Sequence, residues 1–175
     1  MLMKGKDVIL GLLLEMPRTG YEIHEMFQTV FSHFFSGGYG MIYPTLKKLE
    51  STGEVRKEVV IQEGKPNKNI YHITKKGRQA FKNYLQTEIG DDVFQSEFLV
   101  RLYFGSHVND ELLNIWLMEE KERIEEKIRK LKRVDRKWSC NMTQTQKISF
   151  DFGMSMYQAQ LEVVKKYSVG NVSDE

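Results

Sequence analysis

The chain has few of the residue patterns that catalytic and metal sites require. It has a single cysteine, Cys140, so no intrachain disulfide can form, and we expect a reducing compartment, the cytoplasm. Its four histidines show no HxxxH spacing and no CxxC pair occurs, so we expect no metal site. The glycine-rich stretch at 37–40 lacks the lysine and serine of a phosphate-binding loop, and there is no nucleophile elbow. We therefore expect no catalytic residues, no cofactor and no enzyme activity.

Long hydrophobic runs are also missing. No apolar run approaches the ~20 residues of a transmembrane helix, and the first residues lack the apolar stretch and cleavage site of a signal peptide. The apolar content of 41% is ordinary for a folded domain. With 175 residues, the chain can form one large or two small domains, and we expect no membrane partner.

The positive charge is concentrated in one part of the chain. Residues 1–90 hold 13 Lys and Arg against 9 Asp and Glu, a balance of +4, whereas residues 91–175 hold 13 against 15, a balance of −2. Within residues 40–90 the ratio is 10 against 5. Such a local excess of lysine favours DNA binding through counterion release, although a solvated basic face would give the same count.

A short amphipathic helix is expected from about Gly40 onward. Ile42, Leu46 and Leu49 recur at i, i+4 and i+7 and share a face that must pack inward. Pro44 is tolerated because backbone N–H groups in the first turn have no intrahelical partner. The opposite face presents these side chains to solvent: Tyr43, Lys47, Lys48 and Ser51. An ordinary surface helix with solvated lysines would show the same pattern.

Two β-prone runs after this helix predict a hairpin. Residues 58–63 and 68–73 are rich in Val, Ile or Tyr, and Gly64-Lys65-Pro66-Asn67 separates them. Lys65 and Lys68 make the tip cationic, so that it can touch a phosphate backbone or enter a minor groove. A helix followed by a basic hairpin is the arrangement by which a winged helix-turn-helix contacts DNA.

Three separated motifs carry a family resemblance. They are Tyr43-Pro44-Thr45-Leu46 in the helix, Glu63-Gly64-Lys65-Pro66 in the hairpin and Tyr71-His72-Ile73-Thr74-Lys75-Lys76-Gly77 after it. With the stretch from Ile9 to Ile23, they resemble the PadR family of bacterial transcriptional regulators over roughly the first half of the chain. The resemblance implies a recognition helix and a wing that bind double-stranded DNA. The candidate DNA-binding residues are Tyr39, Tyr43, Thr45, Lys47, Lys48, Lys65, Asn67 and Lys68.

Capping residues set the boundaries of the first half. A first helix is expected over residues 6–16, and Thr19 with Glu22 forms a capping box for a second. Thr74 can cap a fourth helix through about Glu88, and residues 90–92 then break the pattern. We expect a mainly α protein with a small β wing. Its domains would be a winged helix-turn-helix at 1–90 and a helical dimerisation domain at 91–175.

The second half is expected to be helical. We expect a short helix at 94–104, a long one from Asn109 or Asp110 to about Trp138, and a last one from Thr143 to Tyr167. Fifteen of the 19 residues at 119–137 are charged. A narrow apolar seam crosses this stretch at a spacing near 3.5 and is typical of a coiled-coil arm. The seam consists of Leu117, Ile124, Ile128, Leu131 and Trp138.

The resemblance also implies partners. In PadR-type regulators the C-terminal helices form a homodimer, and a dyad would let two winged helices read the half-sites of a palindromic operator. The two long final helices resemble the longer subfamily. The chain would then be a sequence-specific regulator, and we expect a repressor released by a small effector or a stress signal. The alternative is a winged-helix and coiled-coil adaptor that binds proteins and no DNA, which the salt dependence of binding would distinguish.

A candidate effector pocket is suggested by the aromatic and methionine residues of the second half. A small aromatic or amphipathic ligand would suit such a lining. At helical spacing these residues are also typical of a hydrophobic core, so both interpretations stay open. The candidate pocket residues are Phe98, Tyr103, Trp116, Met154 and Tyr157.

Overall fold

The computed structural model describes residues 4–35, 39–64, 66–138 and 142–168. The chain divides into two compact units, Met1–Asp92 and Val93–Glu175. Within the described ranges, none of the helices combines the length and the apolar character needed to cross a membrane. Over the same ranges, His, Cys, Asp and Glu side chains do not gather in groups of three or more that could hold a metal ion.

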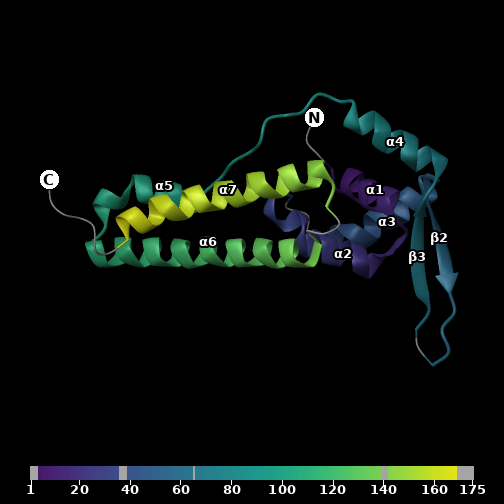
Figure 1. Ribbon diagram of the computed structural model, residues 1–175, viewed down its shortest axis with the longest axis horizontal. Coiled ribbons are helices and arrows are strands. Elements are labelled where there is room, and N and C mark those ends of the chain that lie inside the picture. Colours follow the sequence, from purple (N-terminus) through teal and green to yellow (C-terminus); the bar gives the residue numbers. More distant parts are fainter. Residues whose placement is uncertain (1–3, 36–38, 65, 139–141, 169–175) are drawn as a thin grey trace. The chain divides into compact units, whose positions relative to one another are not determined.

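The first unit is a winged helix-turn-helix (Figure 1). Its α-helices are α1 (Gly5–Glu15), α2 (Gly20–Thr29), α3 (Ile42–Ser51) and α4 (Lys75–Leu85). Two 3-10 turns, η1 (Phe31–His33) and η2 (Tyr39–Met41), precede α3. The strands are β1 (Arg18–Thr19), β2 (Val55–Val60) and β3 (Lys68–Ile73). The expected fold class, mainly helical with a small β wing, is confirmed.

The antiparallel sheet has the order β1-β3-β2. In the long hairpin Val55 pairs with Ile73 and Val60 with Lys68. The first strand of the hairpin was expected at 58–63, about three residues later than β2, because the apolar residues 59–61 favoured that placement over the polar first half of the strand. The two-residue strand β1 was not expected at all. It places Arg18 beside Tyr71, so the start of α2 lies next to the base of the wing.

One hydrophobic core joins the helices to the sheet. Its fully buried side chains come from α1, α2 and α3, and Val55 and Tyr71 add the inner face of the hairpin. The largest fully buried side chains of this core are Ile9, Leu10, Leu13, Ile23, Ile42, Leu46 and Leu49. The three residues of α3 predicted to face inward are among them, so the predicted rotation of this helix is confirmed.

Threonine caps mark where α2 and α4 begin. Thr19 and Glu22 form the expected capping box of α2, with the Glu22 backbone N–H donating to the Thr19 hydroxyl at 3.2 Å. Thr74 caps α4, accepting a hydrogen bond from the Gly77 backbone N–H at 3.2 Å. Gly53, with φ +73°, lies just past α3 in the left-handed conformation that favours glycine. The predicted helix boundaries of this unit hold to within a few residues; the largest of these differences is at α4, which ends at Leu85 where about Glu88 was expected.

The second unit is helical. Its elements are α5 (Glu97–Tyr103), the 3-10 turn η3 (Gly105–His107), α6 (Asp110–Trp138) and α7 (Gln144–Tyr167). Helix α7 runs back alongside α6, and α5 packs near the N-terminal end of α6 (Figure 1). The expected caps are present, since Asn109 Oδ1 accepts from the Leu112 backbone N–H at 2.9 Å and Thr143 caps α7.

The apolar seam of α6 packs against α7 of the same chain, which corrects the coiled-coil interpretation. Leu117, Ile124, Ile128 and Leu131 share one core with Tyr157 and Val164. They are therefore not available to a second chain. The side chain of Trp138, the fifth predicted seam residue, lies outside the described part. On the polar side of α6, Arg129 and Arg133 both contact Glu126, at 2.9 and 3.1 Å. The hydrogen bond from Arg129 is the largest cause that lowers the pKa of Glu126, and the positive charges of Arg129 and Arg133 lower it further.

Candidate nucleic-acid interface

Helix α3 presents the predicted DNA-contacting side chains on the face opposite its core. Ile42, Leu46 and Leu49 are at most 2% exposed, so the helix cannot rotate about its axis without uncovering them. Three predicted residues lie exposed on the remaining surface: Tyr43, Lys47 and Lys48. Thr45 is half-buried, and Tyr39 lies in η2 immediately before the helix, where its side chain is outside the described part.

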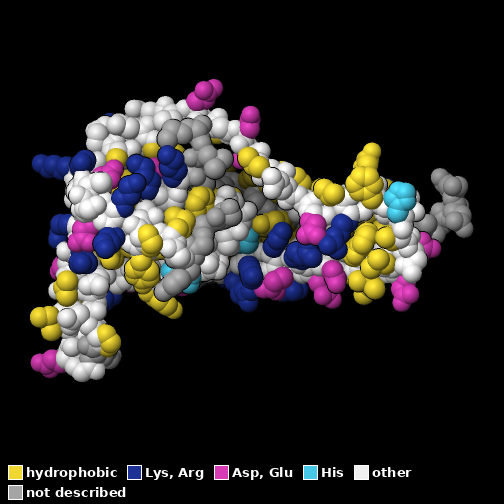
Figure 2. All heavy atoms as spheres, turned by 180° about the vertical axis from the view of Figure 1, so that it is seen from behind, with side chains coloured by type: hydrophobic (Ala, Val, Ile, Leu, Met, Phe, Trp, Pro, Cys, Tyr) yellow, Lys and Arg dark blue, Asp and Glu magenta, His cyan; other side chains and the backbone are white. Residues whose placement is uncertain are grey.

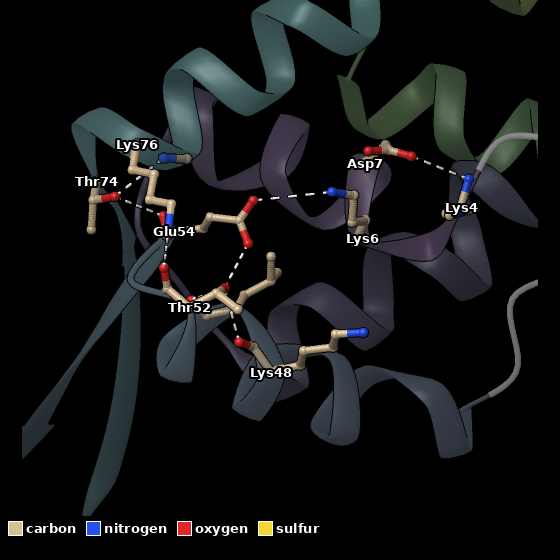
Figure 3. Close-up of polar contacts among 10 residues, drawn as sticks. Lys4, Lys6, Asp7, Lys48, Thr52, Glu54, Thr74 and Lys76 are labelled. Carbon is tan, nitrogen blue, oxygen red and sulfur yellow. Dashed lines mark hydrogen bonds and ion pairs between the residues drawn. The ribbon is translucent and has the colours of Figure 1, made fainter.

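The C-terminal end of α3 is held by the start of α4 (Figure 3). The Lys76 ammonium donates to the Thr52 carbonyl at 2.7 Å, and the Thr74 hydroxyl lies 2.7 Å from the Gly53 carbonyl. The positive charge of Lys76 at this position also interacts favourably with the negative end of the α3 helix dipole. Figure 3 shows the Lys48 side chain pointing away from this polar cluster, so its charge is presented outward.

Two ion pairs connect the wing to the helices behind it. Lys57 on β2 lies 3.7 Å from Glu50 of α3, and Lys68 on β3 lies 3.8 Å from Glu22 of α2. Thr19 donates its backbone N–H to Glu22 at 2.6 Å. That hydrogen bond is the largest cause lowering the pKa of Glu22, which the Thr19 hydroxyl and Lys68 lower further. Each strand of the hairpin is thus tied by one salt bridge to a different helix.

A second polar group lies on the hairpin itself. His72 Nε2 is 2.8 Å from Glu58 Oε2, and Arg56 lies 3.9 Å from the same carboxylate. Arg56 pairs with His72 in the strand register, so the three side chains share one face of the hairpin. Glu58 therefore sets a negative charge among the cations of the wing. This carboxylate was not among the predicted site residues.

The predicted wing-tip residues occupy different situations. Asn67 is exposed in the connection between β2 and β3, whereas Lys68 begins β3 and forms an ion pair with Glu22. Lys65 lies outside the described residues. Gly64 has a φ of +69°, so a glycine is favoured there by the backbone of the turn. The connection spans residues 61–67 and is longer than the four-residue tip expected.

Further cations lie on α4, outside the predicted set. Lys75, Arg78 and Lys82 are exposed. On the face seen in Figure 2, Lys and Arg side chains gather on the first unit above the β2–β3 hairpin. The positive potential of this unit is therefore not confined to α3 and the wing, which suits long-range attraction of a polyanion.

The five predicted effector-pocket residues occupy different environments. Tyr157 is buried, and Phe98 and Met154 pack against the same core. Trp116 is half-buried, with the Arg101 guanidinium carbon 5.9 Å from its ring centroid, whereas Tyr103 is 83% exposed. An open hollow on this unit is lined by residues 94–97, 99 and 100, none of which belongs to the five. Three of the five thus contribute to the core of the unit.

Comparison with known proteins places this fold in a family. Residues 9–83 match the model of the transcriptional regulator PadR-like family, which covers α2, α3, the wing and most of α1 and α4. The PadR-like transcriptional regulator BC1756 from Bacillus cereus is 44% identical in sequence. Its crystal structure superposes with a TM-score of 0.86 over 93% of this chain and 94% of that one. The chain belongs to the PadR-like family. Its members are transcriptional regulators rather than enzymes.

Two other relatives are similar to this PadR-like chain. The crystal structure of smu.1604c from Streptococcus mutans UA159 is 46% identical, with a TM-score of 0.86 over 94% of this chain and 98% of that one. The negative transcriptional regulator PadR of Bacillus subtilis is 33% identical over 102 residues, which are 58% of this chain and 56% of that protein. The alignments with curated relatives thus span about half of those proteins.

Structures of Bacillus subtilis PadR share the fold of this PadR-like chain. Its complex with operator DNA aligns over 92% of this chain and 95% of that one, at 23% identity and a TM-score of 0.78. A complex with p-coumaric acid aligns at 20% identity and a TM-score of 0.69, over 92% and 94%. At these identities the similarity concerns the fold.

The PadR motifs have definite structural places in this chain. The Tyr43 motif forms the first turns of α3, and the Gly64 motif lies in the connection of the wing. The motif that ends at Gly77 forms the joint between β3 and α4, where a side chain on Gly77 would lie 2.1 Å from the Glu54 carbonyl oxygen. Glu22 and Glu50, which hold the wing, were missed as site residues. The sequence marked Glu22 as part of a capping box, whereas no sequence pattern pointed to Glu50.

Proposed function

We propose that the chain is a homodimeric, sequence-specific DNA-binding regulator. In this proposal α3 enters the major groove and the β2–β3 hairpin lies along the neighbouring backbone or minor groove. The observation that carries it is the fixed, outward face of α3, with Lys47 and Lys48 exposed beside a hairpin that two salt bridges tie to the helices. Bacillus subtilis PadR, which shares the fold, has been solved with operator DNA.

The proposed contacts divide into two kinds. Tyr43, Thr45 and Lys47, near the N-terminal half of α3, would reach base edges, where direct readout occurs. Residues on the approach, the helix flank and the wing would contact phosphates and fix the register, which adds affinity without sequence information. The proposed phosphate-contacting residues are Tyr39, Lys48, Lys65, Asn67 and Lys68.

We propose that residues 91–175 form the dimerisation domain and residues 1–90 the DNA-binding domain. The second unit exposes more large apolar side chains than a solvated helical hairpin requires, and such patches mark association surfaces. Figure 2 shows apolar side chains gathered around the end of this unit that carries α5. The most exposed are Val93, Phe94, Val100, Tyr103, Phe104, Met118, Ile148, Phe152, Val163 and Tyr167. A second copy of the chain would cover them and supply the dyad of a palindromic operator.

The direction of regulation and its trigger belong to the same proposal. The Bacillus subtilis relative is named a negative regulator and has been solved with p-coumaric acid. We propose that this chain represses transcription and is released by a small aromatic or amphipathic effector. The candidate pocket residues in the second unit would bind it after a rearrangement of side chains that now fill the core.

The test begins without knowledge of the operator. The full chain is used to enrich duplexes from a random-sequence pool, and its affinity for the enriched duplex is measured against salt. DNA binding predicts an enriched motif with two inverted half-sites and a steep fall of affinity with salt. A Lys47→Ala and Lys48→Ala double variant should bind more weakly, whereas Lys166→Ala, an exposed lysine of α7, serves as the control. Failure to enrich any motif would contradict the proposal and favour the protein-binding adaptor.

A further inference from the structure

Gly20 leaves space that the ring of Tyr43 occupies. It is the first residue of α2 and is buried, and a Cβ built on it would lie 2.7 Å from Tyr43 Cε1, 3.1 Å from Cζ and 3.2 Å from the hydroxyl oxygen. Real Cβ atoms are not found as close as 2.7 Å to another heavy atom, so the ring would have to move. Among the described glycines positive φ is found only at Gly53 and Gly64, so the backbone at Gly20 would accept alanine. The glycine is needed there for space.

Tyr71 approaches the same side of α3 from the sheet. It is 8% exposed on β3 and pairs with Arg18, two residues before Gly20. Tyr71 also pairs with Lys57 of β2, whose ammonium lies 3.7 Å from the Glu50 carboxylate of α3. Tyr43 and Glu50 are seven residues apart and share one side of α3. That side therefore faces the base of the wing.

The Tyr43 ring is held on one side and accessible on the other. With 46% of its surface exposed, it keeps a solvent-facing part at the N-terminal end of α3. A ring seated against the backbone of α2 has fewer rotamers to lose when it binds, which raises affinity by preorganisation. A ring displaced from this seat would retain its chemistry and lose its position.

We propose that Gly20 is a positioning residue for the DNA contact of Tyr43, so that the start of α2 determines how α3 reads DNA. The proposal rests on the proposed DNA-binding function. It requires that a change at Gly20 act on binding through Tyr43 and through no other group.

A double-mutant cycle tests this requirement in the full chain. The probe is the duplex enriched by the wild-type chain, and the variants are Gly20→Ala, Tyr43→Ala and the two combined. We expect Gly20→Ala to weaken binding on the order of tenfold, as removal of one base contact would. In the Tyr43→Ala background the same change should have no further effect, because the ring it displaces is gone. An unchanged affinity in Gly20→Ala, or an equal reduction in both backgrounds, would overturn the proposal.

Gly11→Ala is the matched control. A Cβ on Gly11 would lie 2.9 Å from the Phe81 ring, so it imposes a similar steric clash on a ring that belongs to the α1–α4 packing. Its melting temperature reports the cost of such a clash, and its affinity for the duplex should stay at the wild-type value. A reduction of affinity in Gly11→Ala equal to that in Gly20→Ala would contradict a role specific to Tyr43.

Binding of the enriched duplex by the wild-type chain is established first, so a failure of the proposed function is recognised separately from a failure of this inference.

Discussion

Single residues in the first unit act mainly by fixing where one element ends and the next begins. Thr74, Gly77 and Glu54 form one such joint, in which the helix α4 begins against a backbone carbonyl (Figure 3). The space there admits only glycine, because a Cβ would approach the Glu54 oxygen to 2.1 Å and neither backbone can yield cheaply. The family motif that ends at Gly77 thus has a steric cause.

Gly77→Ala should destabilise the first unit by about 2–4 kcal/mol, since the strand and the helix must move apart. Gly153→Ala is the control, because a Cβ there would meet Leu131 at an ordinary 3.8 Å and alanine favours a helix interior. Urea unfolding of both variants measures the difference. Equal stability of Gly77→Ala and the wild type would show that the joint is not sterically restricted.

The capping box at Thr19 and Glu22 gives a pH-dependent prediction. The pKa of Glu22 is lowered in the folded protein, so its carboxylate contributes stability above its unfolded value of about 4.5 and loses it as pH falls through the folded pKa. Glu22→Gln should therefore be less stable than the wild type at pH 7, and the difference should shrink below pH 4.5. Glu25→Gln, on the same helix, is the control. A difference that is constant from pH 7 to pH 3 would contradict the assignment.

At the scale of elements, α2, α4 and α7 could be predicted because each begins with a threonine cap. The apolar spacing of Ile42, Leu46 and Leu49 fixed the rotation of α3, and Thr19, Thr74 and Thr143 marked helix starts. Strands are set by their partners. Residues 55–58 are largely polar and form a strand because β3 lies beside them, and β1 is too short to show a pattern.

The apolar seam of α6 shows a different limit of sequence reasoning. A stripe at a spacing near 3.5 indicates that another helix packs on it but does not say whether that helix is in the same chain. Here Tyr157 and Val164 of α7 complete the core. The candidate site could be predicted as a helix face and a hairpin. The ion pairs at Glu22 and Glu50 depend on the fold that joins distant segments.

The wing gives a prediction at this scale. Changing Lys65 and Lys68 together to alanine should flatten the slope of log affinity against log salt by about 0.9 for each phosphate that the variant no longer neutralises. Lys68 forms an ion pair with Glu22 in the free protein, so binding to a phosphate would replace the Glu22 carboxylate by the phosphate as its partner. Lys82→Ala, an exposed lysine of α4, reports the contribution of general positive charge. An unchanged slope in the wing variant would show that the hairpin does not touch DNA.

At the scale of the molecule, the proposal requires two copies of the chain. Phe152 is 68% exposed on α7, so Phe152→Glu should leave the fold intact and disfavour burial in an interface. Sedimentation of the full chain should show a shift from dimer toward monomer, while Ser155→Glu, also exposed on α7, stays dimeric. If the Phe152 variant remains a dimer, the association surface lies elsewhere on the chain.

The most direct test of sequence-specific binding is the affinity of the full chain for its enriched duplex and for a scrambled duplex of equal length at the same salt. We predict that two chains bind the enriched duplex at least roughly a thousandfold more tightly than the scrambled one, because two α3 helices then read two half-sites. Equal affinity for the two duplexes would contradict the claim that the outward face of α3 reads DNA sequence.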